Sequence, residues 1–360
     1  MADIIDAAFV RPSKVPIQVS ASLKRQGVSM GGGRDISAAA DYMGPGAIEI
    51  NRYKTEIRDM VKRRFPFGQR VNNTPATGQP SRYFEQLAIP TAAFVDPRVL
   101  SATASVPQRV ERALLLKALT AQINYGLMDV EVNQQQGQFA YLEAKDLTDT
   151  VDGTLKLHDQ KLWSGADTDP LLTTSVEYFG VSGQIFGAAA TSVAAGGPGI
   201  VNIISASGTS IVDTIKTQVA TMASRTDFET RPSAFYANPM FLDAVDQEGK
   251  KFQLYFNQVE ILPGVVVTAI PTQMGNLPLI GDPAISFVAN SNTGQPGTNL
   301  YTGFIVSEDM IEYHYLTDLL PRVFQLGLLG NLAAQFVVVK FGAVICIGSA
   351  YAHTACVLYK

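Results

Sequence analysis

Residues 210–251 read SIVDTIKTQVATMASRTDFETRPSAFYANPMFLDAVDQEGKK and carry signals for a helix, a strand and a second helix. Ser210 and Asp213 form a capping box at the start of the first helix. Residues 233–236 follow an Arg-Pro pair and are strand-like, and Asn238 caps a second helix that has proline at its first position. The first helix has apolar residues at helical spacing, which predict a buried face: Ile211, Ile215, Val219 and Met222. This order predicts an α/β unit.

The sequence on either side of this segment is rich in strand signals. Residues 265–270 and 277–280 are short apolar runs joined by a turn that contains Gly and Pro. The tail from 310 to 360 alternates apolar and polar residues, with frequent glycine and no helix caps. It predicts strands of a buried sheet at 336–339, 343–347 and 355–359. The Gly- and Ala-rich run 186–199 is interpreted as a surface loop.

The clearest single helix lies between residues 146 and 163. Asp146 can cap it and Gly165 can end it. An apolar stripe runs along it: Leu147, Val151, Leu155 and Leu162. Such a helix would be about 27 Å long at 1.5 Å per residue. Asp167 and Asp169 follow it in a turn that we interpret as solvated.

Residues 67–142 are rich in Pro, Thr and Ser, and their prolines exclude a continuous helix. Periodicity leaves 112–132 ambiguous between helix and strand, and we interpret it as the return arm of a long hairpin. In the outgoing arm, the cluster Ser81-Arg82-Tyr83-Phe84 mixes a base with aromatic residues, as single-strand nucleic-acid binders do. Arg, Tyr and Phe are also enriched at interface cores, and we interpret the cluster as an interface anchor.

The N-terminal part is basic on an otherwise acidic chain. Residues 1–70 contain 12 Lys and Arg against 7 Asp and Glu, and the remaining residues contain 16 against 25. Residues 1–46 have few large apolar residues and are interpreted as an extended arm, whereas 48–64 predict a short amphipathic, basic helix. The basic segment has three open interpretations: a solvated helix face, a contact with nucleic acid, or a contact with the acidic body of a neighbouring copy.

The composition indicates a folded protein, since 46% of the 360 residues are hydrophobic and only 17% are charged. The longest apolar candidate, 341–352, is shorter than the roughly 18 residues of a membrane span and contains two glycines. Acidic residues near the start argue against a secretory signal, and two cysteines cannot form a disulfide framework. We expect a soluble protein made in a reducing cytoplasm.

Three common catalytic motifs are missing from the sequence: GxxxxGK[ST], GxGxxG and HExxH. The three histidines are far apart, and His353 and Cys356 would face opposite sides of a strand. The acidic residues before Gly249 lack the pattern of a calcium loop and are interpreted as an exposed helix end. We therefore expect no catalytic, cofactor-binding or metal site.

Three stretches together resemble a known family. QPSRYFEQLAIPTAAFVDPR, residues 79–98, resembles the E-loop of major capsid proteins of tailed double-stranded DNA bacteriophages. DLTDTVDGTLKLHDQKLWSG, residues 146–165, resembles their spine helix, and residues 210–251 with 262–283 resemble their axial (A) domain. The resemblance covers about three quarters of the chain and rests on pattern, without a catalytic motif. It implies an α+β chain with the HK-97-like capsid fold.

The resemblance also implies a division of the chain. It places an N-terminal arm with a short basic helix at 1–65, the E-loop with flanking strands of the peripheral (P) domain at 66–142, the spine helix at 143–169, the A domain at 170–308, and C-terminal strands returning to the P domain at 309–360. It implies six candidates for contacts between subunits: Arg58, Arg63, Arg64, Arg82, Tyr83 and Phe84.

The function implied by the resemblance is structural. Copies would assemble through pentamers and hexamers into an icosahedral shell that encloses double-stranded DNA, held by non-specific electrostatics. The capsomer contacts would lie near 186–199 and 273–277. A separate scaffolding protein, a portal and a cement protein are expected partners. The chain would be assembled in the host bacterial cytoplasm and end in the virion, with no membrane partner.

One feature of some relatives is not expected here. Relatives that join their subunits by a Lys–Asn isopeptide bond use an E-loop lysine, and this sequence has no lysine between Arg63 and Leu116. Two alternatives to a phage capsid stay open: an encapsulin-type nanocompartment with the same fold, and a soluble α/β enzyme of unknown chemistry.

Overall fold

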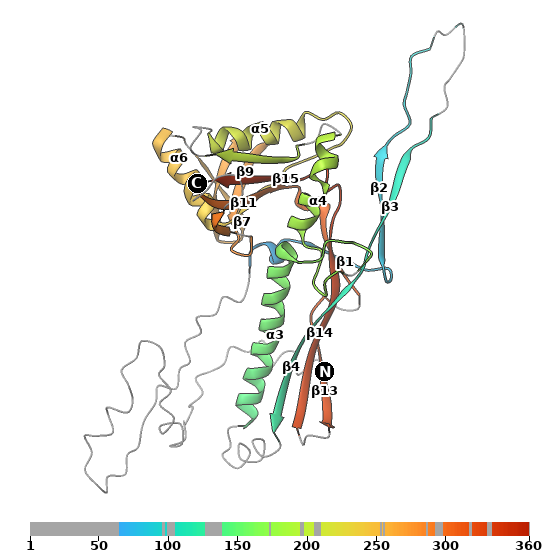
Figure 1. Ribbon diagram of the computed structural model, residues 1–360, viewed down its shortest axis with the longest axis vertical. Coiled ribbons are helices and arrows are strands. Elements are labelled where there is room, and N and C mark those ends of the chain that lie inside the picture. Colours follow the sequence, from blue (N-terminus) through green and yellow to red (C-terminus); the bar gives the residue numbers. More distant parts are fainter. Residues whose placement is uncertain are drawn as a thin grey trace, which may run out of the picture. The chain divides into compact units, whose positions relative to one another are not determined.

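The computed structural model describes most of the chain beyond Arg64 (Figure 1). The described residues are 65–95, 98, 105–126, 139–172, 174–194, 198–204, 210–252, 254, 256–285, 287–291, 298–316, 319–329 and 333–359. The chain divides into two compact units, one formed by Lys62–Tyr125 with Thr150–Lys360 and the other by Met1–Val61 with Gly126–Asp149. Nearly all described elements belong to the first unit.

The larger sheet of this unit has eight strands in the order β5-β15-β11-β6-β9-β8-β7, with β10 paired to β11. Its strands are β5 (Ile200–Ile204), β6 (Ala234–Ala237), β7 (Asn257–Leu262), β8 (Val265–Thr272), β9 (Gly275–Gly281), β10 (Phe287–Ser291), β11 (Thr298–Val306) and β15 (Thr354–Tyr359). The pairs β5/β15 and β6/β9 are parallel, and the other described pairs of this sheet are antiparallel. The sheet is therefore mixed.

Two helices pack on this sheet, and the sequence predicts both correctly. In α5 (Ile211–Ala223), the Ser210 hydroxyl accepts a hydrogen bond from the Asp213 N–H at 3.2 Å. In α6 (Pro239–Phe252), the side chain of Asn238 accepts one from the Met240 N–H at 3.0 Å. The predicted apolar face of α5 is buried, and it joins β-strand residues such as Ile305 in one hydrophobic cluster.

The second sheet has five strands in the order β1-β12-β14-β13, with β4 also paired to β14. Its strands are β1 (Asn72–Pro75), β4 (Lys117–Gly126), β12 (Ile311–Tyr315), β13 (Arg322–Leu329) and β14 (Ala333–Cys346). A hydrophobic cluster that includes Trp163, Tyr236 and Phe304 contains residues of both sheets. The Trp163 ring lies 5.0 Å from that of Phe304 and 5.5 Å from that of Tyr236, measured between centroids. The two sheets therefore share a core.

The long helix is longer than predicted. Helix α3 spans Phe139–Ser164, 26 residues, and so is about 39 Å long at 1.5 Å per residue. Asp146 therefore lies inside the helix, and its prediction as the N-cap is wrong. Good helix formers such as Leu, Glu, Ala and Lys precede Asp146, and they extend the helix toward its N-terminus.

The predicted surface loop at 186–199 is also wrong, because α4 (Val181–Ala194) occupies most of it. Its alanines have the highest helix propensity of any residue, which outweighs the loop signal of the glycines. The side chain of Gln184 donates to the Val344 carbonyl at 2.9 Å and accepts from the Cys346 N–H at 3.0 Å. These bonds hold α4 against β14.

The C-terminal strands differ from the prediction in two ways. The two predicted strands at 336–339 and 343–347 are parts of one strand, β14, which continues through Gly342 and ends at Cys346. The last strand, β15, lies between β5 and β11 in the eight-stranded sheet and does not join β14. The expectation that the terminal strands form one buried sheet is therefore wrong for β15, whose parallel partner β5 lies about 150 residues upstream.

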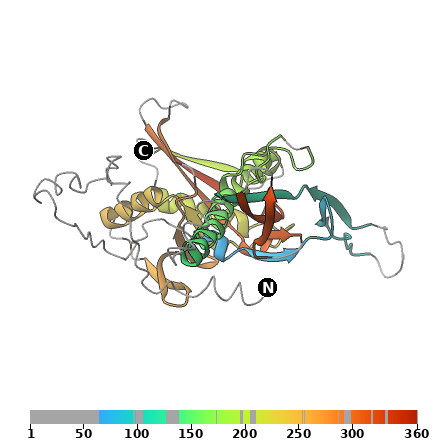
Figure 2. The ribbon, with the colours of Figure 1, turned by 90° about the horizontal axis from the view of Figure 1, so that it is seen from below.

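Strands β2 (Ser81–Ala88) and β3 (Gln108–Leu114) form an antiparallel sheet of their own. Among the described strands, neither pairs with a third. Figures 1 and 2 show them extending away from the two larger sheets. The predicted return arm is confirmed for 112–114, whereas 117–126 forms β4 of the five-stranded sheet.

Among the helices that the structure describes, none combines the length and apolar character needed to cross a membrane.

Candidate interaction surface: a projecting hairpin and its anchors

The hairpin of β2 and β3 exposes apolar side chains. Phe84 is 71% exposed on β2, and further along the same excursion Ile89 is 75% and Val106 84% exposed. We call the exposed set the apolar hairpin surface: Phe84, Ile89, Phe94, Val95 and Val106. Monomeric proteins rarely expose several large apolar residues to solvent on one projecting segment, and such surfaces mark interaction sites.

The predicted contact residues on β2 differ in the direction of their side chains. Arg82 and Phe84 point away from the core, and Arg82 forms an exposed ion pair with Glu111 at 2.8 Å. Tyr83 points inward and is partly buried, so it belongs to the core of its own subunit. The period of two in a strand explains this division. The other candidates, Arg58, Arg63 and Arg64, lie outside the described residues.

The first anchor of the hairpin is apolar. Leu114 at the end of β3 is buried with Ala343 and Ile345 of β14. Partly buried residues pack around this cluster: Tyr83, Leu116, Phe179 and Ile347. The base of the hairpin is therefore covered by β14 and by the segment before α4.

The second anchor is polar and holds β2. Ser81 is fully buried, and its hydroxyl lies 2.7 Å from Nδ1 of His314 on β12. Nε2 of His314 lies 2.9 Å from the Glu312 carboxylate, which can only accept, so Nε2 donates to Glu312. The Glu85 carboxylate of β2 also accepts a bond from the Gly348 N–H at 3.0 Å.

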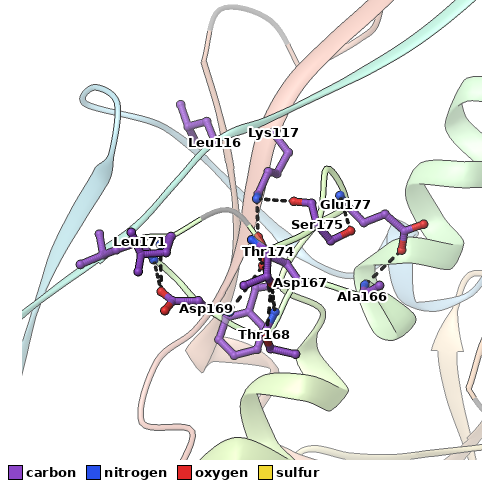
Figure 3. Close-up of polar contacts among 12 residues, drawn as sticks. Leu116, Lys117, Ala166, Asp167, Thr168, Asp169, Leu171, Thr174, Ser175 and Glu177 are labelled. Carbon is purple, nitrogen blue, oxygen red and sulfur yellow. Dashed lines mark hydrogen bonds and ion pairs between the residues drawn. The ribbon is translucent and has the colours of Figure 1, made fainter.

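The third anchor holds the junction between β3 and β4 (Figure 3). Lys117 donates from Nζ to Oδ2 of Asp167 and to the Ser175 carbonyl, the latter at 2.9 Å. The side chains of Lys117 and Asp167 are only 9% and 1% exposed. The other carboxylate oxygen, Oδ1, accepts from the Thr168 N–H at 2.9 Å and from the N–H and hydroxyl of Thr174. All carboxylate oxygens are therefore bonded.

The ionised form of Asp167 is strongly favoured. Burial alone would raise the pKa of this carboxyl, but hydrogen bonds from Lys117 and Thr174 outweigh it and lower the pKa to about 2. The prediction of a solvated turn at Asp167 is therefore wrong. Its partner lies 50 residues earlier, so no local pattern links them.

The described part of the loop between α3 and α4 is held by hydrogen bonds at several points. Oδ1 of Asp169 accepts from the Leu171 and Leu172 N–H groups, both at 2.9 Å, which lowers the pKa of Asp169. The Glu177 carboxylate accepts from the Ala166 N–H at 3.1 Å and pairs with Lys161 on α3. This loop is therefore an ordered platform at the base of the hairpin.

A separate ion pair joins Arg70, near the start of the described residues, to Glu308. Arg70 donates from Nε and Nη2 to the two oxygens of Glu308, both at 2.7 Å, and from Nη1 to the Ile261 carbonyl at 2.8 Å. Tyr236 donates its hydroxyl to the same carboxylate. Burial would raise the pKa of Glu308, but the bonds from Arg70 and Tyr236 outweigh it and lower it. Arg70 therefore links the N-terminal side of the unit to the segment that follows β11 and to β7.

The two cysteines and His353 are buried within the described ranges. Burial raises the pKa of the Cys356 thiol to about 12 and raises that of Cys346 as well, so neither is a reactive thiolate. His353 bonds to the Ile347 carbonyl at 3.2 Å and to the Ser307 N–H. Within these ranges, no three His, Cys, Asp or Glu side chains gather as a metal site.

One of the acidic residues before Gly249 has a structural role that the sequence did not predict. The Glu248 carboxylate accepts from the Ser210 hydroxyl and from the Ile211 N–H, the latter at 2.7 Å. A negative charge at the N-terminus of α5 is favourable, because that end of a helix carries partial positive charge. Glu248 therefore joins α6 to α5, and it is not part of a solvated helix end.

The architecture matches solved structures with the HK-97-like fold. The head structure of Helicobacter pylori bacteriophage KHP40 aligns with a TM-score of 0.55 and 9% identity, over 87% of this chain and 94% of that chain. The capsid of cyanophage A-1(L) aligns with a TM-score of 0.53 and 11% identity, over 81% and 91%. The SrpI encapsulin of Synechococcus elongatus aligns with a TM-score of 0.50 and 14% identity, over 91% and 95%.

These likenesses establish the fold class. The chain is an α+β protein with the HK-97-like fold, as the sequence predicts. No protein-family model matches the sequence, and no curated protein matches it either. The likeness therefore rests on the three-dimensional fold.

Proposed function

We propose that this chain is a major capsid protein, a structural subunit without enzymatic activity that assembles through pentamers and hexamers into an icosahedral phage shell around double-stranded DNA. The observation that carries the proposal is the match with phage capsid chains over more than nine tenths of their length. The apolar hairpin surface supports it, since a shell subunit needs projecting elements whose apolar residues are covered only after assembly.

The division of the chain follows from this proposal, with one change. The arm would span 1–65, the E-loop region 66–142, the spine helix 143–169 and the A domain 170–308, with 309–360 containing the terminal strands. Strand β15 is assigned to the A-domain sheet, because it lies between β5 and β11.

The contact residues proposed for assembly are Arg82 and Phe84, with the basic residues Arg58, Arg63 and Arg64 of the arm. Because α4 packs on β14, we place the capsomer contact near the turn at 273–277 and not on 186–199. Packaged DNA would be held by sequence-independent electrostatics. A scaffolding protein, a portal and a cement protein are proposed partners, with assembly in the bacterial cytoplasm and a final place in the virion.

The second candidate is an encapsulin-type compartment, and the match with the Synechococcus elongatus encapsulin over 95% of that chain favours it. The test is expression of the full chain alone and with its neighbouring genes, followed by sedimentation and cryo-electron microscopy. Closed shells support both candidates, and their contents separate them. A shell that fills with DNA when the packaging genes are present supports the capsid, whereas a stoichiometric cargo enzyme supports the compartment. A stable monomer or small dimer under every condition contradicts both.

A further inference from the structure

The direction of the hairpin is set at its base. Strands β2 and β3 pair only with each other among the described strands, so no larger sheet guides them. Only Leu115 and Leu116 separate the end of β3 from the start of β4. The Leu115 N–H donates to the Pro170 carbonyl at 2.9 Å, and the Leu116 N–H donates to the Gln79 side chain at 2.9 Å. The junction is thus attached to the loop between α3 and α4.

The two strands are held by different parts of the subunit. Strand β2 is held by β12 and the turn after β14, through Ser81 and Glu85. The β3–β4 junction is held by the α3–α4 loop, through Lys117 and Asp167. A hairpin held at one point can rotate about that point, whereas a hairpin held at two separate points has a fixed direction. Together with the apolar anchor at Leu114, the Lys117 anchor therefore limits the rotation that the β2 anchor alone would allow.

A small rotation at the base would move the far end of the hairpin by a large amount. The eight residues of β2 span about 26 Å at 3.3 Å per residue, so a tilt of roughly 10° displaces its end by about 4–5 Å. That displacement exceeds the range of a van der Waals contact. The apolar hairpin surface could then no longer meet a matching surface on another copy.

We propose that Lys117 and Asp167 are positioning residues for shell assembly: their ion pair fixes the direction of the β2–β3 hairpin and so determines whether the apolar hairpin surface reaches the neighbouring subunit. The inference rests on the proposed function as a shell subunit. The loop suits this role, because Asp167 is itself held by Thr168 and Thr174 and cannot turn away from Lys117 without losing those bonds.

The test uses the full chain and the double variant Lys117→Met/Asp167→Asn. Asparagine keeps the acceptor oxygen for Thr168 and Thr174, and methionine keeps the volume of lysine, so the ion pair and the bond from Lys117 to the Ser175 carbonyl are removed while the other bonds of the loop stay. The matched control is Lys161→Met/Glu177→Gln, which removes an ion pair of the same loop at 2.8 Å that does not touch the hairpin. Hydrogen exchange of the unassembled subunit and the yield and diameter of particles are measured for each.

In the double variant, we expect exchange in β2 and β3 to rise about tenfold while β11 and β15 stay unchanged, and the yield of wild-type-sized particles to fall at least about fivefold. The control should stay within about twofold of wild type on both measures. If the double variant does not fold, Asp167→Asn alone is measured against Asp167→Glu, which should restore assembly.

Three outcomes would overturn the inference, and they separate its failure from that of the proposed function. Wild-type particles together with normal assembly of the double variant overturn this inference and leave the proposed function standing. Absence of wild-type particles under all conditions overturns the proposed function, and this inference with it. Equal losses in the double variant and the control also overturn the inference, because they would reflect general destabilisation of the loop.

Discussion

Replacing Glu308 by glutamine should destabilise the subunit through the charge left on Arg70. The two side chains are 18% and 17% exposed and share two hydrogen bonds at 2.7 Å. Breaking a fully buried pair by removing one partner costs about 3–5 kcal/mol. Because water reaches part of this pair and the Ile261 carbonyl still accepts from Arg70, we expect a loss of about 2 kcal/mol.

The assay is thermal unfolding of the unassembled subunit, followed by the fluorescence of Trp163. This is the one tryptophan of the chain, and it is fully buried beside Tyr236. A loss of 2 kcal/mol should lower Tm by about 4–8 °C for a unit of this size. The matched control is Glu111→Gln, which breaks the exposed Arg82–Glu111 pair at 2.8 Å. It should lower stability by less than about 0.5 kcal/mol. Equal Tm values for the two variants would refute the reasoning that burial determines the cost.

Three further changes test other parts of the account. Ser210→Ala removes the cap that accepts from the Asp213 N–H, and urea titration should show a loss of about 1 kcal/mol. Ile215→Ala opens a cavity at a fully buried position of α5 and should cost about 3 kcal/mol in the same titration, whereas a loss below 1 kcal/mol would contradict its place in the core. Burial lowers the pKa of His353 to about 4, so the unfolded chain binds a proton first as the pH falls. Stability should therefore drop between about pH 6.5 and 4, and His353→Asn should flatten that slope in melts at a series of pH values.

Local signals account for what the sequence predicts well. The caps at Ser210 and Asn238 each involve residues only two or three positions apart, and the spacing of the apolar face of α5 is also local. The same reasoning predicted β8 and β9, because each strand is a short apolar run ended by a turn. Interactions over such short distances can be derived from propensity and capping alone.

The features that sequence reasoning missed depend on residues far apart in the chain. The sheet that contains β15 is determined by its pairing with β5, and an alternating pattern does not say which sheet a strand joins. Asp167 and Asp169 have the same residue type and the same turn, yet only Asp167 faces a lysine, from a strand 50 residues earlier. Likewise, α4 is specified by its contact with β14 through Gln184 as much as by its alanines.

The candidate contact surface was predicted in part for the same reason. The sequence identified the cluster at 81–84 but could not assign its faces without the register of β2 against β3. That register directs Ser81 and Tyr83 into the subunit and leaves Phe84 exposed. The family resemblance supplied the remaining step, from an exposed hairpin to a surface that contacts another copy.

The most direct test of the central claim is a cryo-electron microscopy map of the particles formed by the full chain, at a resolution that shows side chains. The account predicts a closed shell of pentamers and hexamers in which the β2–β3 hairpin of each subunit lies on a neighbouring copy and Phe84 is covered. Particles in which Phe84 and the rest of the apolar hairpin surface remain exposed to solvent, or a protein that stays a monomer, would contradict it.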